Sequence, residues 1–215
     1  MATEAGTRAD PGRRYEALLV DFGGVLTSDV FSSFTAFCAT EELAPDLVAQ
    51  KFMADPAGRG LLFGLEDGTL SEVDFEPRFA AVLGISRSQG LIDRLFAGMR
   101  PDGAMIEAVR GARRAGVRTG MVSNSWGAGR YDRSQLAELF DAVVISAEEG
   151  VRKPDPAIYV LGAERIGVSP SDCVFVDDLP GNLKPARELG MATVHHRSAG
   201  QTIPELERLL GVALG

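Results

Sequence analysis

The sequence contains few cysteines and no long apolar segment. Only two of its 215 residues are cysteine, Cys38 and Cys173, and both fall in segments with the pattern of a packed helix or strand. This number argues against a disulfide framework, so we expect reduced, buried thiols. No apolar run approaches the roughly 20 residues of a membrane-spanning helix, and residues 1–14 contain no apolar stretch typical of a signal peptide. We therefore expect a cytoplasmic protein that does not enter membranes.

Basic residues are in the minority. The chain has 22 Lys and Arg against 30 Asp and Glu, which gives a formal net charge of −8. Nucleic acids and anionic membrane surfaces attract Lys- and Arg-rich proteins, so neither is expected as a partner. A small anionic substrate remains compatible if a cation lies in its site. The composition is globular, and the length fits one domain or one domain with an insertion.

Short apolar runs recur along the chain and predict a parallel sheet. They lie at residues 17–20, 117–122, 142–145 and 174–176, with a weaker run at 192–194. Such runs, closed by glycine or polar residues, are typical of strands buried on both faces. Helical patterns lie between them, and one begins at Asp155-Pro156 with an N-cap followed by proline. This alternation predicts an α/β fold with a Rossmann-like, three-layer core around a parallel sheet.

One interval interrupts the alternation. Residues 28–100 separate the first two predicted strands and carry apolar residues at helical spacing, starting near Phe31, Leu43, Phe75 and Leu91. A crossover between parallel strands does not need so many residues, so we predict an inserted helical cap. It would stand over the carboxyl edge of the sheet, where ligands bind in such folds. The predicted division is a flexible tail at 1–14, a core at 15–27 and 101–215, and a cap at 28–100.

Polar side chains follow three of the predicted strands, and a lysine lies in a nearby loop. These residues are Asp21, Ser123, Asn124, Asp177, Asp178 and Lys153. In a parallel sheet, the carboxyl ends of the strands share one edge. Carboxylates there can hold Mg²⁺, lysine can neutralise a phosphate, and a carboxylate can also attack phosphorus. The pattern predicts a site for one divalent cation and one phosphoryl group.

Four motifs in this order resemble the haloacid dehalogenase (HAD) superfamily of hydrolases. They are DFGGVLT at 21–27, VSN at 122–124, KPD at 153–155 and FVDD at 175–178, and the resemblance covers roughly residues 15–197. Residues 123–126 and 176–191 look most like the N-terminal phosphatase domain of soluble epoxide hydrolase and its bacterial relatives. The insertion matches a cap placed after the first motif. The resemblance implies a Mg²⁺-dependent phosphatase that acts on a small phosphorylated metabolite.

The resemblance also implies which residues hold the metal. Asp21 would be the nucleophile, and its second carboxylate oxygen would ligate Mg²⁺. Gly23 would offer its backbone carbonyl, and Asp178 would be a direct ligand. Asp177 would act directly or through water, and Asn182 is a weaker candidate for orienting a metal-bound water.

Three further residues are implied in phosphate binding. The Ser123 hydroxyl and the backbone N–H of Asn124 would hold phosphoryl oxygens. Lys153 would neutralise both the nucleophile and the phosphate. Trp126 follows this loop, and it is expected either to pack in the interior or to face the cap.

The sequence departs from the pattern of the superfamily at Gly23. Phosphatases of this superfamily usually have a second Asp here, which protonates the leaving oxygen and later activates water. Glycine can do neither, and general acid–base catalysis contributes about 10²–10⁴-fold. Hydrolysis of alkyl phosphates should therefore be slowed more than that of esters with acidic leaving groups.

Two alternatives stay open at this point. One is a haloacid dehalogenase, in which Asp21 displaces halide at carbon without a metal; such enzymes normally carry a Ser-rich fourth motif. The other is a phosphate-ester-binding protein with weak or no turnover, because Gly23 lacks the acid. The sequence does not identify the substrate or the oligomeric state.

Overall fold

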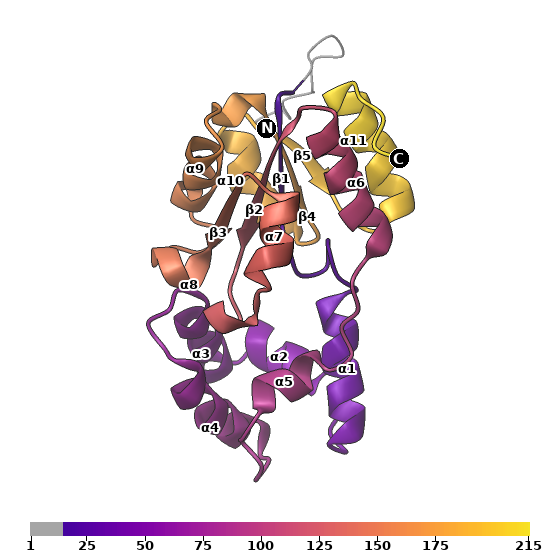
Figure 1. Cartoon of the computed structure of the whole chain (residues 1–215). Helices are drawn as coiled ribbons and strands as arrows, with labels where there is room; N and C mark the ends of the chain where they lie inside the picture. Colours follow the sequence, from indigo (N-terminus) through magenta and orange to yellow (C-terminus); the bar gives the residue numbers. More distant parts are fainter. Residues whose placement is uncertain (1–14) are drawn as a thin grey trace, which may run out of the picture.

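Five parallel strands form a single sheet at the centre of the core (Figure 1). The structure is a computed structural model that describes residues 15–215, apart from the side chain of residue 128. The tail predicted at 1–14 lies outside the described residues. The strand order is β3-β2-β1-β4-β5. The strands are β1 (Ala17–Val20), β2 (Arg118–Ser123), β3 (Ala142–Ile145), β4 (Cys173–Asp177) and β5 (Ala192–His195).

Helices cover both faces of this sheet. One face packs against α6 (Gly103–Arg114), α7 (Arg133–Leu139) and α11 (Ala199–Leu210), and the other against α9 (Pro156–Arg165) and α10 (Pro180–Glu188). Short helices α8 (Ser146–Glu149), η1 (Ala128–Arg130) and η2 (Pro170–Asp172) complete the core. The predicted three-layer, Rossmann-like α/β fold is confirmed.

The central strand shows why continuous apolar runs form this sheet. All four residues of β1 are fully buried. Because side chains alternate between the faces of a strand, Leu18 and Val20 join the hydrophobic cluster on the α6 side, whereas Ala17 and Leu19 join the cluster on the α9 side. A strand covered on both faces has no polar side.

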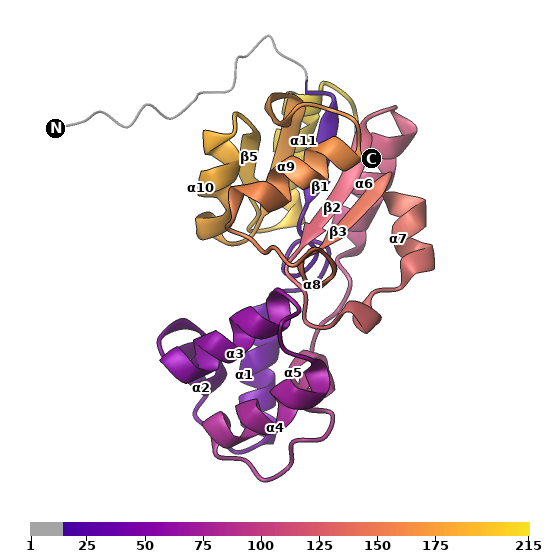
Figure 2. The ribbon, with the colours of Figure 1, turned by 90° about the vertical axis from the view of Figure 1, so that its left-hand side faces the viewer.

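Residues between β1 and α6 form five further helices with their own hydrophobic cluster. Figure 2 shows them as a separate lobe below the sheet, and we call them the cap. They are α1 (Val30–Thr40), α2 (Leu47–Met53), α3 (Pro56–Glu66), α4 (Glu72–Leu83) and α5 (Leu91–Phe96). Helix α3 is absent from the sequence-based prediction, and α2 begins later than the apolar pattern from Leu43 indicates.

Two chain segments connect the cap to the core, and they lie side by side. Thr27 and Pro101 form an isolated antiparallel bridge. The Ser28 N–H donates to the Arg100 carbonyl at 2.7 Å, and the Arg100 N–H donates to the Ser28 hydroxyl at 3.1 Å. These contacts support the proposed boundaries at residues 28 and 100.

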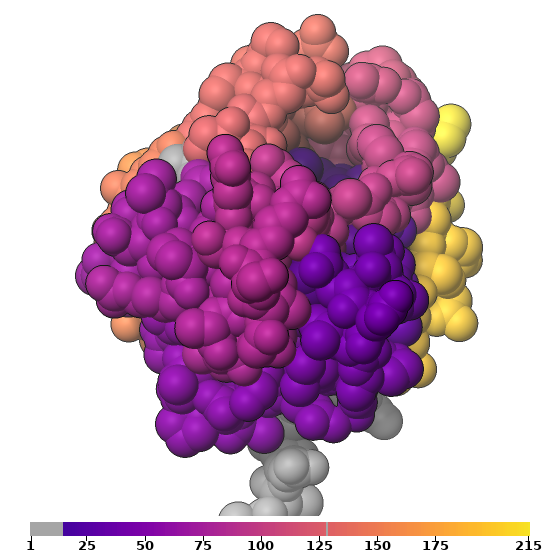
Figure 3. Space-filling view, turned by 90° about the horizontal axis from the view of Figure 1, so that it is seen from below, coloured from indigo at the N-terminus to yellow at the C-terminus, as the bar shows by residue number. Residues whose placement is uncertain are grey.

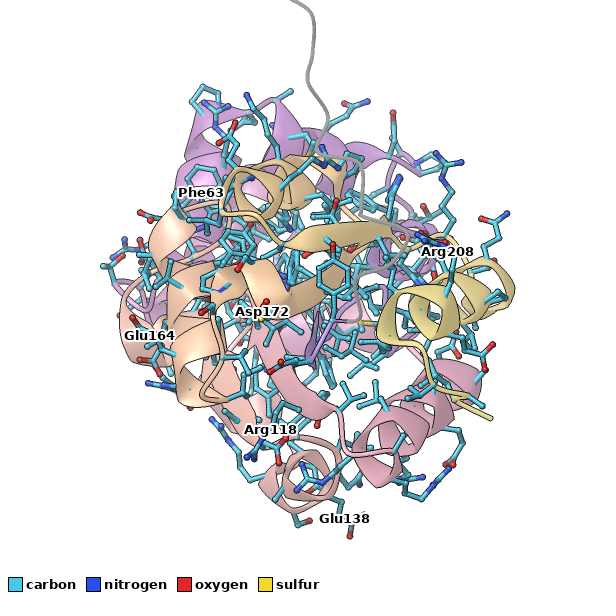
Figure 4. The ribbon with its side chains drawn as sticks, turned by 90° about the horizontal axis from the view of Figure 1, so that it is seen from above. Phe63, Arg118, Glu138, Glu164, Asp172 and Arg208 are labelled. Carbon is cyan, nitrogen blue, oxygen red and sulfur yellow. The ribbon has the colours of Figure 1, made fainter. Side chains whose placement is uncertain are left out.

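The cap faces the carboxyl ends of the strands. Viewed from the other end of the molecule, Arg118 and Asp172 lie near the starts of β2 and β4 (Figure 4). The register places Val20 level with both Met121 and Val176. The residues that follow these positions therefore project together toward the cap. Within residues 15–215, no helix has the length and apolarity needed to cross a membrane.

Candidate active site

A cavity of about 420 Å³ lies between the sheet edge and the cap. Seen from the cap end, a hollow opens between the magenta edge of the cap and the salmon-coloured segment near α7 (Figure 3). All but one of the residues predicted for the site line this cavity: Asp21, Gly23, Ser123, Asn124, Lys153, Asp178 and Asn182. The exception is Asp177, which is fully buried behind it.

Asp21 is held at the end of β1 by the neighbouring strand. Its N–H donates to the Val176 carbonyl at 2.9 Å, and its Oδ1 accepts the Phe22 N–H at 2.7 Å. Gly24 follows with φ of +72°, and a Cβ there would overlap the carboxylate of Asp178. Glycine at position 24 therefore permits both the left-handed turn and the approach of Asp178 to the loop.

A buried lysine joins two of the carboxylates. Lys153 Nζ lies 2.7 Å from Asp21 Oδ1 and 2.7 Å from Asp177 Oδ2, and the lysine is only 1% exposed. Burial alone would lower the pKa of this ammonium group, but the charges of Asp177 and Asp21 raise it above its ordinary value. Lys153 therefore stays protonated and provides a fixed positive charge beside Asp21.

Both carboxylate oxygens of Asp177 already accept bonds from the protein. Besides Lys153, its carboxylate accepts the Leu179 N–H at 2.9 Å and the Asn182 Nδ2 amide at 3.0 and 3.1 Å. These bonds fix the start of α10 and hold the lysine. They favour Asp177 as the anchor of Lys153 over a direct metal ligand, and they engage Asn182 with a carboxylate.

The three aspartates crowd negative charge into a small volume. Oxygen atoms of Asp21, Asp177 and Asp178 lie within 4.8 Å of one another. Burial raises the pKa of Asp21 to about 8, with Lys153 opposing and the other two carboxylates adding to the rise. Burial and Asp177 also raise the pKa of Asp178 to about 6. Within the described residues Asp178 forms no salt bridge, so Asp21 and Asp178 fit a hard divalent cation.

Ser123 and Asn124, the phosphate-binding candidates after β2, lie on the other side of β1 from Asp177 and Asp178. The Asn124 side chain accepts the Lys153 N–H at 2.8 Å and donates to the Lys153 carbonyl at 3.1 Å, which ties the two loops together. The Ser123 hydroxyl at the end of β2 lies 3.0 Å from the Tyr131 hydroxyl. Burial raises the pKa of Tyr131 to about 12, so this phenol remains protonated at neutral pH.

Tyr131 and Glu66 are among the lining residues that the sequence-based prediction did not include. Tyr131 lies in an irregular stretch rich in Gly and Arg, where no pattern identifies it. Glu66 lies at the end of α3, and its Oε2 pairs with Arg152 Nε at 2.6 Å. A signal for α3 was present, because Asp55-Pro56 repeats the N-cap and proline pair that predicted α9 correctly.

Comparison with known proteins gives consistent matches. The haloacid dehalogenase-like hydrolase family matches residues 15–190. Bifunctional epoxide hydrolase 2 of Sus scrofa is 35% identical over 131 residues, which is 58% of this chain and 24% of that protein. Glyceraldehyde 3-phosphate phosphatase of Methanopyrus kandleri is 32% identical over 128 residues, 58% of this chain and 53% of that protein. The chain thus spans about a quarter and about half of these two relatives.

Solved structures share the fold. A HAD family enzyme of Bacteroides thetaiotaomicron, in complex with magnesium and inorganic phosphate, superposes with a TM-score of 0.63 at 22% identity. The match covers 85% of this chain and 94% of that one. At this identity the match bears on the fold alone.

Proposed function

This chain belongs to the haloacid dehalogenase-like hydrolase family, and we propose that it is a Mg²⁺-dependent phosphatase of small phosphorylated organic molecules. The observation that carries the proposal is the placement of Asp21, with one carboxylate oxygen on Lys153 and with Asp178 close by, at the floor of the cavity. The phosphatase among its relatives supports it.

Asp21 is the proposed nucleophile. Its carboxylate oxygen attacks phosphorus, the ester P–O bond breaks, and the leaving oxygen departs with the bonding electrons and takes a proton from water. Water then attacks the aspartyl-phosphate, releasing inorganic phosphate and the free carboxylate. Lys153, Ser123 and the Asn124 N–H hold the phosphoryl oxygens throughout.

Asp21 and Asp178, with the Gly23 carbonyl, would hold Mg²⁺. The bound ion supplies charge that offsets the repulsion between a carboxylate nucleophile and a phosphate dianion. Burial and the neighbouring carboxylates raise the pKa values of Asp21 and Asp178, so both groups favour a nearby positive charge. Among the described residues, Lys153 is the one cation paired with Asp21 and Asp177, so a second cation fits the donor set.

The test is hydrolysis of p-nitrophenyl phosphate by the purified chain. We expect turnover with Mg²⁺ and none with EDTA. Asp21→Asn keeps the shape and removes the nucleophile, and turnover should fall by about 10⁴-fold or more. Glu138→Gln, a carboxyl-to-amide change on the exposed surface of α7 (Figure 4), is the matched control and should retain parental turnover. Equal turnover in the parent and Asp21→Asn would refute the proposal.

The dehalogenase alternative makes the opposite prediction about the metal. Displacement of halide at carbon needs no metal, so Asp178 would have no metal to ligate in it. Release of chloride from 2-chloropropionate in EDTA, with no phosphate release from p-nitrophenyl phosphate in Mg²⁺, would favour that chemistry over phosphatase activity.

A further inference from the structure

We propose that the organic group of the substrate is apolar. In this proposal, which rests on the phosphatase function above, the substrate is a phosphate monoester of an apolar alcohol or phenol. The phosphoryl group lies on the sheet edge, and the hydrocarbon part fills the cap side of the cavity. The cap side thus selects against phosphorylated sugars, polyols and nucleosides.

The cap side of the cavity is lined by hydrocarbon. Aromatic side chains dominate, and they come from three cap helices or their ends and from the loop after Ser123. The main members, which we call the roof, are Phe31, Phe34, Phe52, Leu62, Phe96 and Trp126. A volume of about 420 Å³ is ample for a small organic ligand. The roof therefore offers burial of apolar surface as its main source of binding free energy.

Trp126 packs against three rings of the roof. Its ring lies edge-on to three phenylalanines, with centroid distances of 5.7 Å to Phe34, 5.3 Å to Phe52 and 4.9 Å to Phe96. The loop that binds phosphate thus continues directly into the cap cluster. An apolar group attached to a phosphate held at Ser123 would meet these rings.

The carboxylate that lines the cap side is already paired. Glu66 is buried, and its carboxylate is bound by Arg152. The guanidinium of Arg152 in turn lies 3.8 Å from the centroid of the Phe63 ring. Replacing these contacts with bonds to a sugar hydroxyl would break a buried ion pair, which is costly.

The arginines that line the cavity are paired as well. Arg130 binds Glu72, with Nη2 to Oε2 at 2.9 Å, and also Asp93, so its charge is neutralised by two carboxylates. Arg100 donates from Nη1 to the carbonyls of Ala97 at 3.0 Å and Met99 at 2.8 Å. Over the roof, hydroxyl groups would lose water without gaining a hydrogen-bond partner, and such unpaired groups are strongly disfavoured.

A homologous series of alkyl phosphates measures how much contact between the hydrocarbon chain and the roof contributes to binding. Ethyl, butyl, hexyl and octyl phosphate differ little in the acidity of the leaving alcohol, so differences in kcat/KM report binding of the chain. We expect kcat/KM to rise about threefold to fourfold per added methylene until the cavity is full. Glycerol phosphate and glucose 6-phosphate should fall below butyl phosphate. A flat series, or faster hydrolysis of glucose 6-phosphate than of hexyl phosphate, would overturn the inference.

Two variants test whether the preference for long alkyl chains comes from the roof. Phe31→Gln places an amide in the roof and should lower kcat/KM for octyl phosphate by about tenfold or more, with little effect on ethyl phosphate. Val73→Gln is the matched control, because Val73 is 83% exposed on α4, away from the cavity. If Phe31→Gln does not fold, Met53→Gln substitutes for it, since Met53 lines the cavity while 68% exposed.

Binding can be followed without turnover, because Trp126 is the single tryptophan of the chain. Alkyl phosphonates are not cleaved, and we expect octyl phosphonate to change Trp126 fluorescence at concentrations at least about tenfold below those needed for ethyl phosphonate. Octanol should bind far more weakly. If p-nitrophenyl phosphate is not hydrolysed but this preference holds, the phosphatase proposal fails and the apolar subsite stands. Normal hydrolysis with equal affinity for both phosphonates would refute the subsite alone.

Discussion

The two walls of the cavity are built in different ways. The floor, which we define as Asp21, Ser123, Lys153 and Asp178, consists of charged and polar groups, three of them at strand ends and the lysine in the loop before α9, and this lysine is held at 2.7 Å from two carboxylates. The roof consists of side chains whose contacts are ring against ring, such as Phe52 stacked on Phe79 at 4.4 Å. The floor depends on charged groups and the directions of their hydrogen bonds, whereas the roof depends on how apolar side chains pack and how much apolar area they bury.

In the proposed function, this difference separates the groups that react from those that recognise the substrate. Asp21, Ser123 and Asp178 follow strands whose register fixes their positions, and Lys153 is held by its ion pairs with Asp21 and Asp177, which suits groups that must meet a reacting atom within tenths of an ångström. All roof residues except Trp126, which lies in a loop, come from cap helices that contact one another through hydrophobic packing, and such packing tolerates volume-conserving changes among apolar side chains. The same floor can therefore serve different substrates when the roof changes.

The largest loss of stability is expected from removing the lysine of the floor. Lys153→Met keeps nearly the same shape but leaves Asp177 and Asp21 without their cation. We expect the free energy of unfolding in EDTA to fall by about 3–5 kcal/mol at pH 8. At pH 6 the loss should be smaller, because the pKa of Asp21, already about 8 beside the lysine, lets this carboxyl become neutral. Urea denaturation at both pH values measures the difference.

The matched control neutralises the carboxylate that the lysine serves. Lys153→Met combined with Asp177→Asn removes both charges of the buried pair. The double variant should recover part of the loss, because no unpaired charge remains at Asp177. A single Lys153→Met variant as stable as the parent would show that charge does not hold the floor together.

The floor was more predictable from sequence than the roof. Polar residues directly after apolar runs mark the carboxyl ends of strands, so the pattern alone was enough to place Asp21, Ser123 and Asp178 at one edge of the sheet. Lys153 needed its motif, because a loop lysine has no periodicity. Asp177 anchors Lys153 and also contacts Asn182 and Leu179. No pattern in the sequence predicts these contacts.

The roof was harder to predict, because glycines weaken the helical pattern of one of its helices. Helix α3 contains Gly58, Gly60 and Gly64, and glycine costs about 1 kcal/mol relative to alanine in a helix. At Gly58 a side chain would overlap the Lys51 carbonyl of α2, so tertiary packing requires the residue that weakens the helical pattern. Leu62 and Glu66 were missed for the same reason. The start of this helix at Asp55-Pro56 is visible in the sequence, but the contact that requires Gly58 is not.

A smaller effect is expected where the two walls meet, at Gly23. A Cβ there would lie 3.2 Å from Val30 Cγ2 of α1, a tight but adjustable contact. Gly23→Asp supplies the missing acid, and we expect kcat for butyl phosphate to rise by about tenfold or more. For p-nitrophenyl phosphate the gain should be within about twofold, because its leaving group needs no proton.

Gly23→Asn is the control for this change. It has the size of aspartate and meets Val30 in the same way, but it cannot transfer a proton. We expect no gain for either substrate. Equal gains for Asp and Asn would mean that the substitution acts through the loop, and no gain for Asp would refute our account of the missing acid.

The smallest effect is expected from changing the hydrophobic cluster of the cap behind the roof. Phe75 is fully buried and stacks on Phe79 at 5.2 Å, but it does not line the cavity. Phe75→Leu keeps an apolar side chain of similar length, and we expect a loss of about 1–1.5 kcal/mol in unfolding free energy. Hydrolysis of p-nitrophenyl phosphate should change less than twofold. The floor change at Lys153 preserves shape and removes charge, whereas this change preserves polarity and alters shape. A loss at Phe75 equal to that at Lys153 would mean that both walls depend equally on exact shape, and the contrast between them would no longer hold.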